Sequence, residues 1–477
     1  MKRTTSHSIF LTLLLVLCTS IAGQSQTILV PPYLQPGNAA TLNKESKVIL
    51  WETDSLEGTF QVRYSTASGK KKVMTAKISK TNLSLAGKRT WIYRAVLPNL
   101  RFDEAYTYTV SLQNKIIAQA TFTSRSKKQQ THFAVIGDFG AGTPEQLSIA
   151  KLLEQHKPDF VLTTGDNAYQ DGRTSEYRKN LFPYYLPMHV DSSMKLMQTT
   201  PFYMLMGNHD IHSRDLSKFP DGLAYFYYND LPLNAPPTTL TLPVYGDENQ
   251  VATFKKVTKG KYPNMLNYSF DYGNVHITCL DANLYINPVD PVLLQWLSED
   301  IGKSKAEWKI VTYHHPPFNS SIAHYTDQHM RLLAPFLEEW KVDLVVNGHV
   351  HNYQRTVPLR FKPQINEAGD RYVVGPEGEI NGTFALDTLY DGQKDTTPEG
   401  IIYIVTGASG APLYDRKISN QPERWKHEPK ENWVPFTVKL ISDRHSFTLI
   451  DTKSKTLVLR QIDGTGQVID TITITKN

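Results

Sequence analysis

The stretch "FAVIGD", residues 133–138, is a continuous apolar run that ends in a glycine and an aspartate. A strand with one face in water alternates apolar and polar residues, so a continuous run predicts a strand that is covered on both faces. Four further stretches have the same character and also end in polar side chains: "FVLTTGD" (160–166), "FYMLMGNHD" (202–210), "WKIVTYHH" (308–315) and "VDLVVNGHVH" (342–351). Together these runs predict a buried sheet with a largely parallel component.

Helical patterns separate several of these runs. Apolar residues recur at helical spacing in "EQLSIAKLLEQH" (145–156), "PVLLQWLSEDI" (291–301) and "MRLLAPFLEEW" (330–340). An alternation of strand and helix predicts βαβ units, and we assign residues 131–477 to one α/β domain. Residues 212–265 and 357–398 break the alternation. We interpret both as long surface excursions, one of which could overhang a functional site.

Residues 28–125 have a different pattern. Short runs in which apolar and polar residues alternate, such as "KVILWET" (47–53), "WIYRAVL" (91–97) and "YTYTVSL" (106–112), are separated by turn-forming segments. Alternation with a period of two and frequent turns predicts an all-β sandwich. Tyr106, at the start of a predicted strand, suits the tyrosine corner of such sandwiches.

The first residues have the layout of a secretory signal peptide, which we assign to residues 1–23. Lys2 and Arg3 precede an apolar run that is short for a membrane span, and small residues come after it. Cys18 could instead accept a lipid, although Leu17 is not the small residue that lipoprotein signals require. No other apolar run approaches about 18 residues, so no transmembrane segment is predicted in the mature protein. We expect a secreted or periplasmic location.

Composition narrows the function further. A formal charge of +5 over 477 residues, without a dense Lys/Arg block, gives little support to nucleic-acid binding. The chain has two cysteines, one of them in the signal segment, so Cys279 is expected to be a buried, unreactive thiol. The core must therefore rest on packing alone or on packing together with bound metal. The oligomeric state is not indicated.

The polar residues that end the five apolar runs form a candidate metal site. Side chains just past the carboxyl ends of the strands of an α/β sheet meet in one crevice. Taken singly, such an aspartate is usually a turn former and such a histidine an ordinary polar residue, as we interpret His132, His156 and His276. The set as a whole offers oxygen and imidazole ligands without thiolate, which suits Fe, Mn or Zn. One aspartate can bridge two such ions. The strand-end residues are Asp138, Asp166, Asn208, His314, His349 and His351.

Five short motifs, in order along the chain, resemble those of the purple acid phosphatases, within the calcineurin-like metallophosphoesterases. They are "GDFG" (137–140), "GDNAY" (165–169), "GNHD" (207–210), "VTYH" (311–314) and "GHVH" (348–351). The segments "PPYLQP" (31–36) and "VILWETD" (48–54) resemble that family's N-terminal domain. The resemblance implies a fibronectin-III-like sandwich before a catalytic domain of layered sheets flanked by helices.

The resemblance also implies a pair of metal ions. Asp138, Tyr169 and His351 would bind Fe(III), and Asp166 would bridge it to a divalent ion, Fe, Zn or Mn. Gly140 stands where many relatives carry a histidine ligand, and Tyr169 would take over that role. Because tyrosine loses its proton only to a strong Lewis acid, a phenolate ligand favours ferric iron. The ligands implied for the divalent ion are Asn208, His314 and His349.

The implied activity is the hydrolysis of phosphate monoesters by in-line attack of a metal-bound hydroxide, at acid pH, on a phosphorylated small molecule or ester. His209 would contact the substrate phosphate and His324 would protonate the leaving group. Two alternatives stay open: a phosphodiesterase on the same metal core, and a non-catalytic exported binding protein with a vestigial site. Asp210 and Gln354 depart from the Glu that many plant members carry, which leaves the substrate specificity open.

Overall fold

The computed structural model describes residues 27–69, 73–85, 87–321, 323–369, 371–376, 378–414 and 434–477. The predicted signal peptide, with Cys18, lies outside this part of the chain. None of the helices among the described residues is long and apolar enough to span a bilayer.

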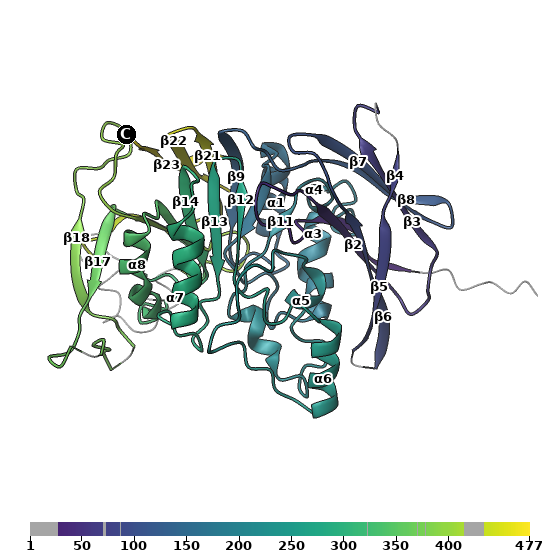
Figure 1. Cartoon of the computed structure of the whole chain (residues 1–477), viewed down its shortest axis with the longest axis horizontal. Helices are drawn as coiled ribbons and strands as arrows, with labels where there is room; N and C mark the ends of the chain where they lie inside the picture. Colours follow the sequence, from purple (N-terminus) through teal and green to yellow (C-terminus); the bar gives the residue numbers. More distant parts are fainter. Residues whose placement is uncertain are drawn as a thin grey trace, which may run out of the picture.

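Two antiparallel four-stranded sheets form the N-terminal region, at the right of Figure 1. Side chains from both sheets, among them Trp51, Val62 and Tyr108, form one buried cluster, so the predicted sandwich is present. The Tyr106 hydroxyl accepts a hydrogen bond from the backbone N–H of Arg101 at 2.9 Å, which is the contact of a tyrosine corner. The first sheet has the order β1 (Ile28–Gln35), β2 (Lys47–Thr53), β6 (Lys88–Leu97), β5 (Lys77–Leu85), and the second β4 (Met74–Thr75), β3 (Phe60–Thr66), β7 (Ala105–Leu112), β8 (Lys115–Thr123).

The remainder of the chain folds around two larger sheets rather than one. The first has the order β11 (Phe202–Tyr203), β10 (Phe160–Thr163), β9 (Gln130–Ile136), β21 (Ser446–Lys453), β22 (Thr456–Asp463), β23 (Val468–Thr475). The second has the order β12 (Tyr268–Tyr272), β13 (Val275–Leu280), β14 (Trp308–Tyr313), β15 (Leu344–Asn347), β19 (Ile402–Thr406), β16 (Tyr353–Thr356), β20 (Thr437–Ile441). Strands β9 to β11 are mutually parallel, and so are β13, β14, β15 and β19. The apolar runs are therefore shared between two sheets, three in one and two in the other.

Helices cover these sheets (Figure 1). Thr143 caps the longest of them, α1, by accepting from Gln146 N, and Lys157 ends it in a left-handed conformation. Helices α7 and α8 pack with the seven-stranded sheet in a second core, where Leu297, Leu337 and Val345 are fully buried. The helical segments are α1 (Pro144–His156), α2 (Thr174–Glu176), η1 (Tyr177–Leu181), α3 (Phe182–Tyr185), α4 (Leu196–Thr199), η2 (His209–Arg214), α5 (Tyr225–Tyr228), α6 (Glu248–Val257), α7 (Pro291–Leu297), η3 (Ser298–Gly302), η4 (His329–Leu333) and α8 (Ala334–Glu339).

The two excursions lie at opposite ends of the α/β region, residues 131–477. Residues 212–265, with α5 and α6, extend toward the sandwich, where Asp230 pairs with Arg94 of β6. The segment 357–398 contains a hairpin of β17 (Leu359–Pro363) and β18 (Gly382–Leu386), and β17 packs on α8. The excursions thus mainly extend the fold sideways from the two central sheets.

Arg125 fastens the sandwich to the rest of the protein. It comes after β8 in the chain, and its side chain is 1% exposed. The guanidinium donates to the Glu45 carboxylate at 2.6 Å and to the carbonyl oxygen of Asp271 at 3.0 Å. It also donates to three carbonyls of the loop before β2, those of Ala40, Thr41 and Lys44. Since Asp271 belongs to β12, this one side chain joins the two regions.

Candidate metal centre

The polar residues that end the apolar runs meet where the carboxyl ends of the two central sheets face each other. Asp138 and Asp166 come after β9 and β10 of one sheet, and His314 comes after β14 of the other. All three are buried, and each can place one ligand atom within 4.8 Å of the others. Asn208, His349 and His351 complete the group through their contacts with these residues and with Tyr169. The convergence expected from the sequence is therefore present, although it joins two sheets.

Tyr169 lies in this group and is 6% exposed. Its hydroxyl oxygen is 3.3 Å from Asp138 Oδ1, 3.1 Å from Asp166 Oδ2 and 3.1 Å from His351 Nε2. A hydroxyl has a single proton to give, so it satisfies at most one of these three neighbours. Lone pairs of two carboxylate oxygens and one imidazole nitrogen are therefore gathered around the Tyr169 hydroxyl.

Gly140 has no room for a side chain. A Cβ atom at this position would lie 1.8 Å from the carbonyl oxygen of Asn167 and 2.9 Å from Cα of Ala168. The backbone of the second motif fills the space, and Tyr169 N donates to Gly140 O at 2.9 Å. A histidine side chain at position 140 therefore cannot be accommodated with the observed backbone path of residues 167–169.

Two imidazoles are oriented by backbone carbonyls. The Nδ1 atom of His314 lies 2.8 Å from Thr164 O, and that of His351 lies 2.7 Å from Pro412 O. A proton on Nδ1 leaves Nε2 as an acceptor, and Nε2 of His314 faces Asn208 Oδ1 at 2.9 Å and Asp166 Oδ2 at 3.4 Å. Acceptors that face each other in a buried site need a cation between them, either a proton or a metal ion, and an imidazole held through its opposite nitrogen by a carbonyl is typical of metal-binding histidines. The residues present therefore fit a metal centre of oxygen and nitrogen ligands.

His349 is oriented differently. Its Nε2 lies 3.1 Å from Asp327 Oδ2, so Nδ1 is the atom left for an ion. Its backbone N–H donates to both carboxylate oxygens of Asp138, at 3.0 and 2.9 Å. The fifth motif thus positions the carboxylate of the first motif as well as its own side chain.

Burial and charge act on the protonation of these groups. Burial, and then the carboxylates of Asp166 and Asp138, raise the pKa of Tyr169 well above its usual value. Only a strong positive charge would convert this hydroxyl into a phenolate. Burial lowers the pKa of His314, but the Asp166 carboxylate outweighs it and raises that pKa to about 9.

The backbone is unusual at the same positions. Asp138, Asp166, His349 and His324 have φ angles of 55°, 54°, 69° and 57°, in the left-handed region that residues other than glycine rarely adopt. Such conformations cost about 1–3 kcal/mol each and tend to gather at functional sites. The fold thus holds these four residues in a conformation that they would not adopt in isolation.

The structure places both proposed catalytic histidines beside the centre. His209 packs on the Tyr169 ring with centroids 4.4 Å apart, and its Nδ1 lies 2.6 Å from Gln170 O. His324 packs on His349 with centroids 3.9 Å apart, and its side chain is 35% exposed. Both rings are thus next to the candidate ligands and partly open to solvent.

Three nearby residues were not foreseen from the sequence. Asp327 contacts His324 and His349; its spacing three residues after His324 was a signal that could have been noticed. Tyr414 stacks on His351 at 4.0 Å and 9°, and no sequence pattern singles it out. The buried Nδ1 of His315 has no hydrogen-bond partner among the described residues.

The two departures from the plant pattern are internal. Asp210 is fully buried and accepts hydrogen bonds from Gly207 N at 2.9 Å and Asn167 Nδ2 at 2.8 Å. Burial, and then the Asp166 carboxylate, raise its pKa to about 7. Gln354 is 3% exposed and donates to Asn319 Oδ1 and Asn352 Oδ1. Both side chains support the loops of the centre from beneath rather than lining its mouth.

Comparison with known proteins agrees with this geometry. The family model for calcineurin-like phosphoesterases matches residues 131–353. Purple acid phosphatase 17 of Arabidopsis thaliana is 30% identical over 280 residues, which cover 55% of this chain and 75% of that protein. The chain belongs to the purple acid phosphatase family. The family that the five motifs resembled is thereby confirmed.

Other relatives define the extent of the match. A phosphoenolpyruvate phosphatase of Allium cepa is 27% identical over 295 residues, which cover 60% of this chain and 54% of that protein. The chain spans about half the length of the first curated relatives it matches. The purple acid phosphatase PPD1 of yellow lupin (Lupinus luteus) seeds superposes with a TM-score of 0.62 at 18% identity, over 94% of this chain and 74% of that one. The two-part fold, sandwich and layered catalytic sheets, is therefore that of a purple acid phosphatase.

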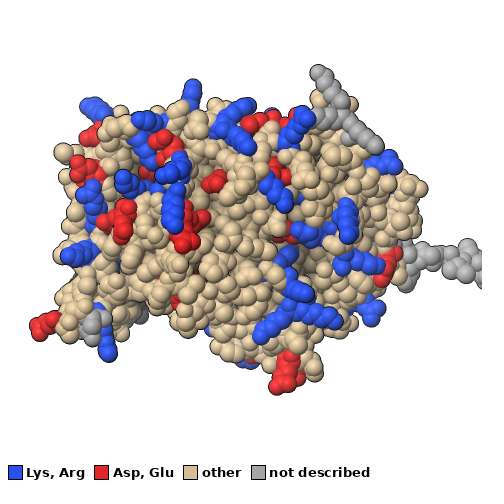
Figure 2. Space-filling model, in the orientation of Figure 1, with Lys and Arg blue, Asp and Glu red and all other residues tan. Residues whose placement is uncertain are grey.

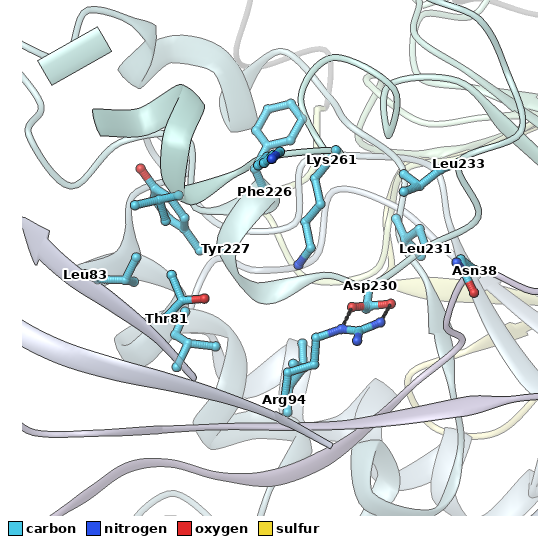
Figure 3. A pocket seen from close by; sticks show the side chains of 15 residues that line it. Asn38, Thr81, Leu83, Arg94, Phe226, Tyr227, Asp230, Leu231, Leu233 and Lys261 are labelled. Atoms are coloured by element: carbon cyan, nitrogen blue, oxygen red, sulfur yellow. Dashed lines mark hydrogen bonds and ion pairs between the residues drawn. The ribbon is translucent and has the colours of Figure 1, made fainter. Parts of the chain in front are cut away.

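A pocket of about 310 Å³ lies away from the metal centre, between the sandwich and the 212–265 excursion (Figure 3). Arg94 and Asp230 join across it in an ion pair, with Lys261 above them. Lys and Arg side chains lie over this region, near α6, β5 and β6, and also at the upper left of the same face, with acidic side chains interspersed in both places (Figure 2). The pocket shares no lining residue with the metal centre, and its charged pair links the two regions.

Proposed function

We propose that this protein is a binuclear-metal phosphatase that hydrolyses phosphate monoesters. Asp138, Tyr169 and His351 would hold a ferric ion, and Asp166 would contact both ions. When bound, two such ions neutralise the charge of the phosphate and lower the pKa of a water molecule. The ligands proposed for the divalent ion are Asn208, His314 and His349.

The side chains beside the centre have separate tasks in this proposal. His209 is held through Nδ1 by Gln170 O and presents Nε2 to the substrate phosphate, to which its imidazolium form would donate a hydrogen bond. His324 presents Nε2 and gives its proton to the departing oxygen, which avoids the release of an unstable alkoxide. The burial of the cluster keeps bulk water away and strengthens each of these interactions.

One observation carries the proposal most strongly. The Tyr169 hydroxyl lies within 3.3 Å of Asp138, Asp166 and His351, at a point where Gly140 can supply nothing. A phenolate favours Fe(III), and ferric iron keeps its hydroxide in acid. We therefore extend the proposal to activity at acid pH, and, from the signal-like N-terminus, to an exported protein.

A visible spectrum with metal analysis tests the proposal. The metal-replete protein should contain two ions per chain and show a tyrosinate–Fe(III) charge-transfer band that Tyr169→Phe abolishes. Two divalent ions and no band would overturn the ferric assignment. Rates on p-nitrophenyl phosphate and on its bis-ester should favour the monoester, and the reverse order would establish a phosphodiesterase. No hydrolysis of either ester would leave the binding-protein alternative.

A further inference from the structure

The loop after His314 contains a short turn, His324 to Asp327, that is fixed from two sides. Within the turn, Asp327 N donates to His324 O at 3.1 Å. Behind it, Gln328 Oε1 accepts from Ile380 N at 3.1 Å, and His329 Nε2 lies 2.8 Å from Ala282 O. The position of the Asp327 carboxylate is therefore determined by contacts with two distant segments of the chain.

A single oxygen of Asp327 contacts two histidines. Its Oδ2 lies 3.3 Å from Nδ1 of His324 and 3.1 Å from Nε2 of His349. Each imidazole thereby has one nitrogen occupied. His349 keeps Nδ1 for an ion, and His324 keeps Nε2, which lies 3.4 Å from the Tyr414 hydroxyl. One carboxylate sets the orientation of a candidate metal ligand and of a candidate proton donor at the same time.

We propose that Asp327 is a positioning residue that holds His349 for the divalent ion and His324 for proton donation to the leaving group. This inference rests on the proposed function. An accepting carboxylate fixes which imidazole nitrogen carries the proton and raises the basicity of the other, which strengthens metal binding. For His324 the same bond restricts the ring to the orientation from which Nε2 reaches the leaving oxygen.

The same side chains allow one competing explanation. His315, Asp327 and His349 can each place a ligand atom within 4.8 Å of the others, so they could hold a third ion. The contacts of Asp327 Oδ2 with two imidazole nitrogens at hydrogen-bond distance favour positioning. The number of ions per chain separates the two explanations.

The first measurement is metal binding. Asp327→Asn keeps the size of the side chain and removes its charge. Asp300→Asn is a matched control, because Asp300 accepts from His276 Nε2 at 3.0 Å away from the centre. In calorimetric titrations of the metal-free proteins with Zn²⁺, Asp327→Asn should bind about 10- to 100-fold more weakly than the parent protein. His324→Gln and Asp300→Asn should bind as the parent does.

The second measurement is leaving-group dependence at saturating metal. Nitrophenolate departs without a proton, whereas an alkyl oxide requires one, so only alkyl phosphates depend on His324. Asp327→Asn should lose about 10²-fold more in kcat/KM on an alkyl phosphate than on p-nitrophenyl phosphate. His324→Gln should show the same selective loss, and the double variant should lose nothing further, because both changes act through one imidazole.

Three results would overturn the inference. In the first, Asp327→Asn matches the parent in either measurement. In the second, it loses activity equally on all esters, as a general destabilisation would cause. In the third, the parent binds a third ion that Asp327→Asn loses. If the metal-replete parent hydrolyses no monoester, the proposed function fails. The titration would then still decide whether Asp327 positions His349.

Discussion

Two buried histidine–carboxylate clusters lie at neighbouring strands, β13 and β14, of the seven-stranded sheet. They differ in the number of N–H and O–H donors relative to the acceptors around them. In one, His276 of β13 contacts Asp271 Oδ1 through Nδ1 at 2.7 Å and Asp300 Oδ2 through Nε2 at 3.0 Å. An imidazolium has two N–H groups, and each finds a carboxylate. This His276 cluster is complete in itself.

In the metal centre, by contrast, the acceptor atoms outnumber the protons available to them. The Nδ1 protons of His314 and His351 go to backbone carbonyls, and a single further proton on Nε2 of His314 would be shared between Asn208 Oδ1 and Asp166 Oδ2. Tyr169 adds one proton among three neighbours. A surplus of electron pairs over protons, rather than the presence of histidine and aspartate, distinguishes a site prepared for a cation from a structural ion pair.

The largest expected effect comes from removing the residue shared by both proposed ions. Asp166→Ala should lose both metals and lower phosphatase activity by at least about 10³-fold, since metal ions supply several kcal/mol of stabilisation and each 1.4 kcal/mol is a factor of ten. Metal analysis and the rate on p-nitrophenyl phosphate check this. Full activity in the variant would show that the metal centre, like the His276 cluster, is a structural ion pair.

The His276 cluster should instead respond to pH. Burial opposes its charge, but hydrogen bonds to Asp271 and Asp300 raise the pKa of His276 to about 9. Because the folded pKa lies above the unfolded value near 6.5, the charged histidine contributes stability fully below about pH 6.5, and the contribution is lost as the pH rises toward 9. It amounts to about 3 kcal/mol at most.

Urea unfolding between pH 6 and pH 10 measures this contribution. His276→Gln should flatten the decline in the unfolding free energy over that interval, whereas a change at the exposed His189 should not. A parallel decline in His276→Gln and the parent protein would mean that the histidine is neutral, and the two clusters would then be alike.

Gly140 tests the packing on which the metal centre depends. Gly140→Ala places a methyl group 1.8 Å from Asn167 O, so the backbone must shift, at a cost of about 2 kcal/mol, and Tyr169 must move with it. Thermal unfolding and the tyrosinate band should both change. Gly464→Ala is the control, because its nearest neighbour would be His445 O at 3.7 Å. An unchanged band would show that the Tyr169 position does not depend on Gly140.

The smallest effect is expected beneath the centre. Asp210→Asn places an amide among donors from Gly207 and Asn167, and one unmatched hydrogen bond should lower the unfolding free energy by about 1 kcal/mol. Substrate preference should stay as in the parent, because the side chain is fully buried. A changed ratio of rates on two monoesters would show that Asp210 influences substrate specificity.

The strand-end residues could be found from the sequence because continuous apolar runs locate buried strands, and the residues just after a strand lie at the edge of its sheet. The same rule could not say that three runs belong to one sheet and two to another, since the apolar pattern carries no partner information. The family and the two-part fold are confirmed. The ligand roles of Asp138, Tyr169 and the others stay predictions.

Asp327 illustrates what the sequence does not contain. It lies in a loop, thirteen residues after His314, and its two contacts depend on Gln328 and His329 meeting Ile380 and Ala282 far along the chain. The course of the 212–265 excursion was equally hidden: its ion pair with the sandwich, Asp230 to Arg94, requires a surface complementarity that no local pattern reports.

Arg125 has a consequence for how substrate reaches the centre. All five N–H groups of its guanidinium are engaged, with Glu45, with the loop before β2 and with Asp271 of β12. Of these bonds, the one to Asp271 crosses between the two regions, and buried bonds from the Tyr108 hydroxyl to Gln198 O and from the Tyr228 hydroxyl to Glu52 cross beside it. A hinge at this junction would have to break all of them, so we expect the sandwich and the catalytic sheets to move as one body. Entry to the metal centre is then a matter of the loops at its rim, such as the turn that carries His324, and not of one region opening away from the other.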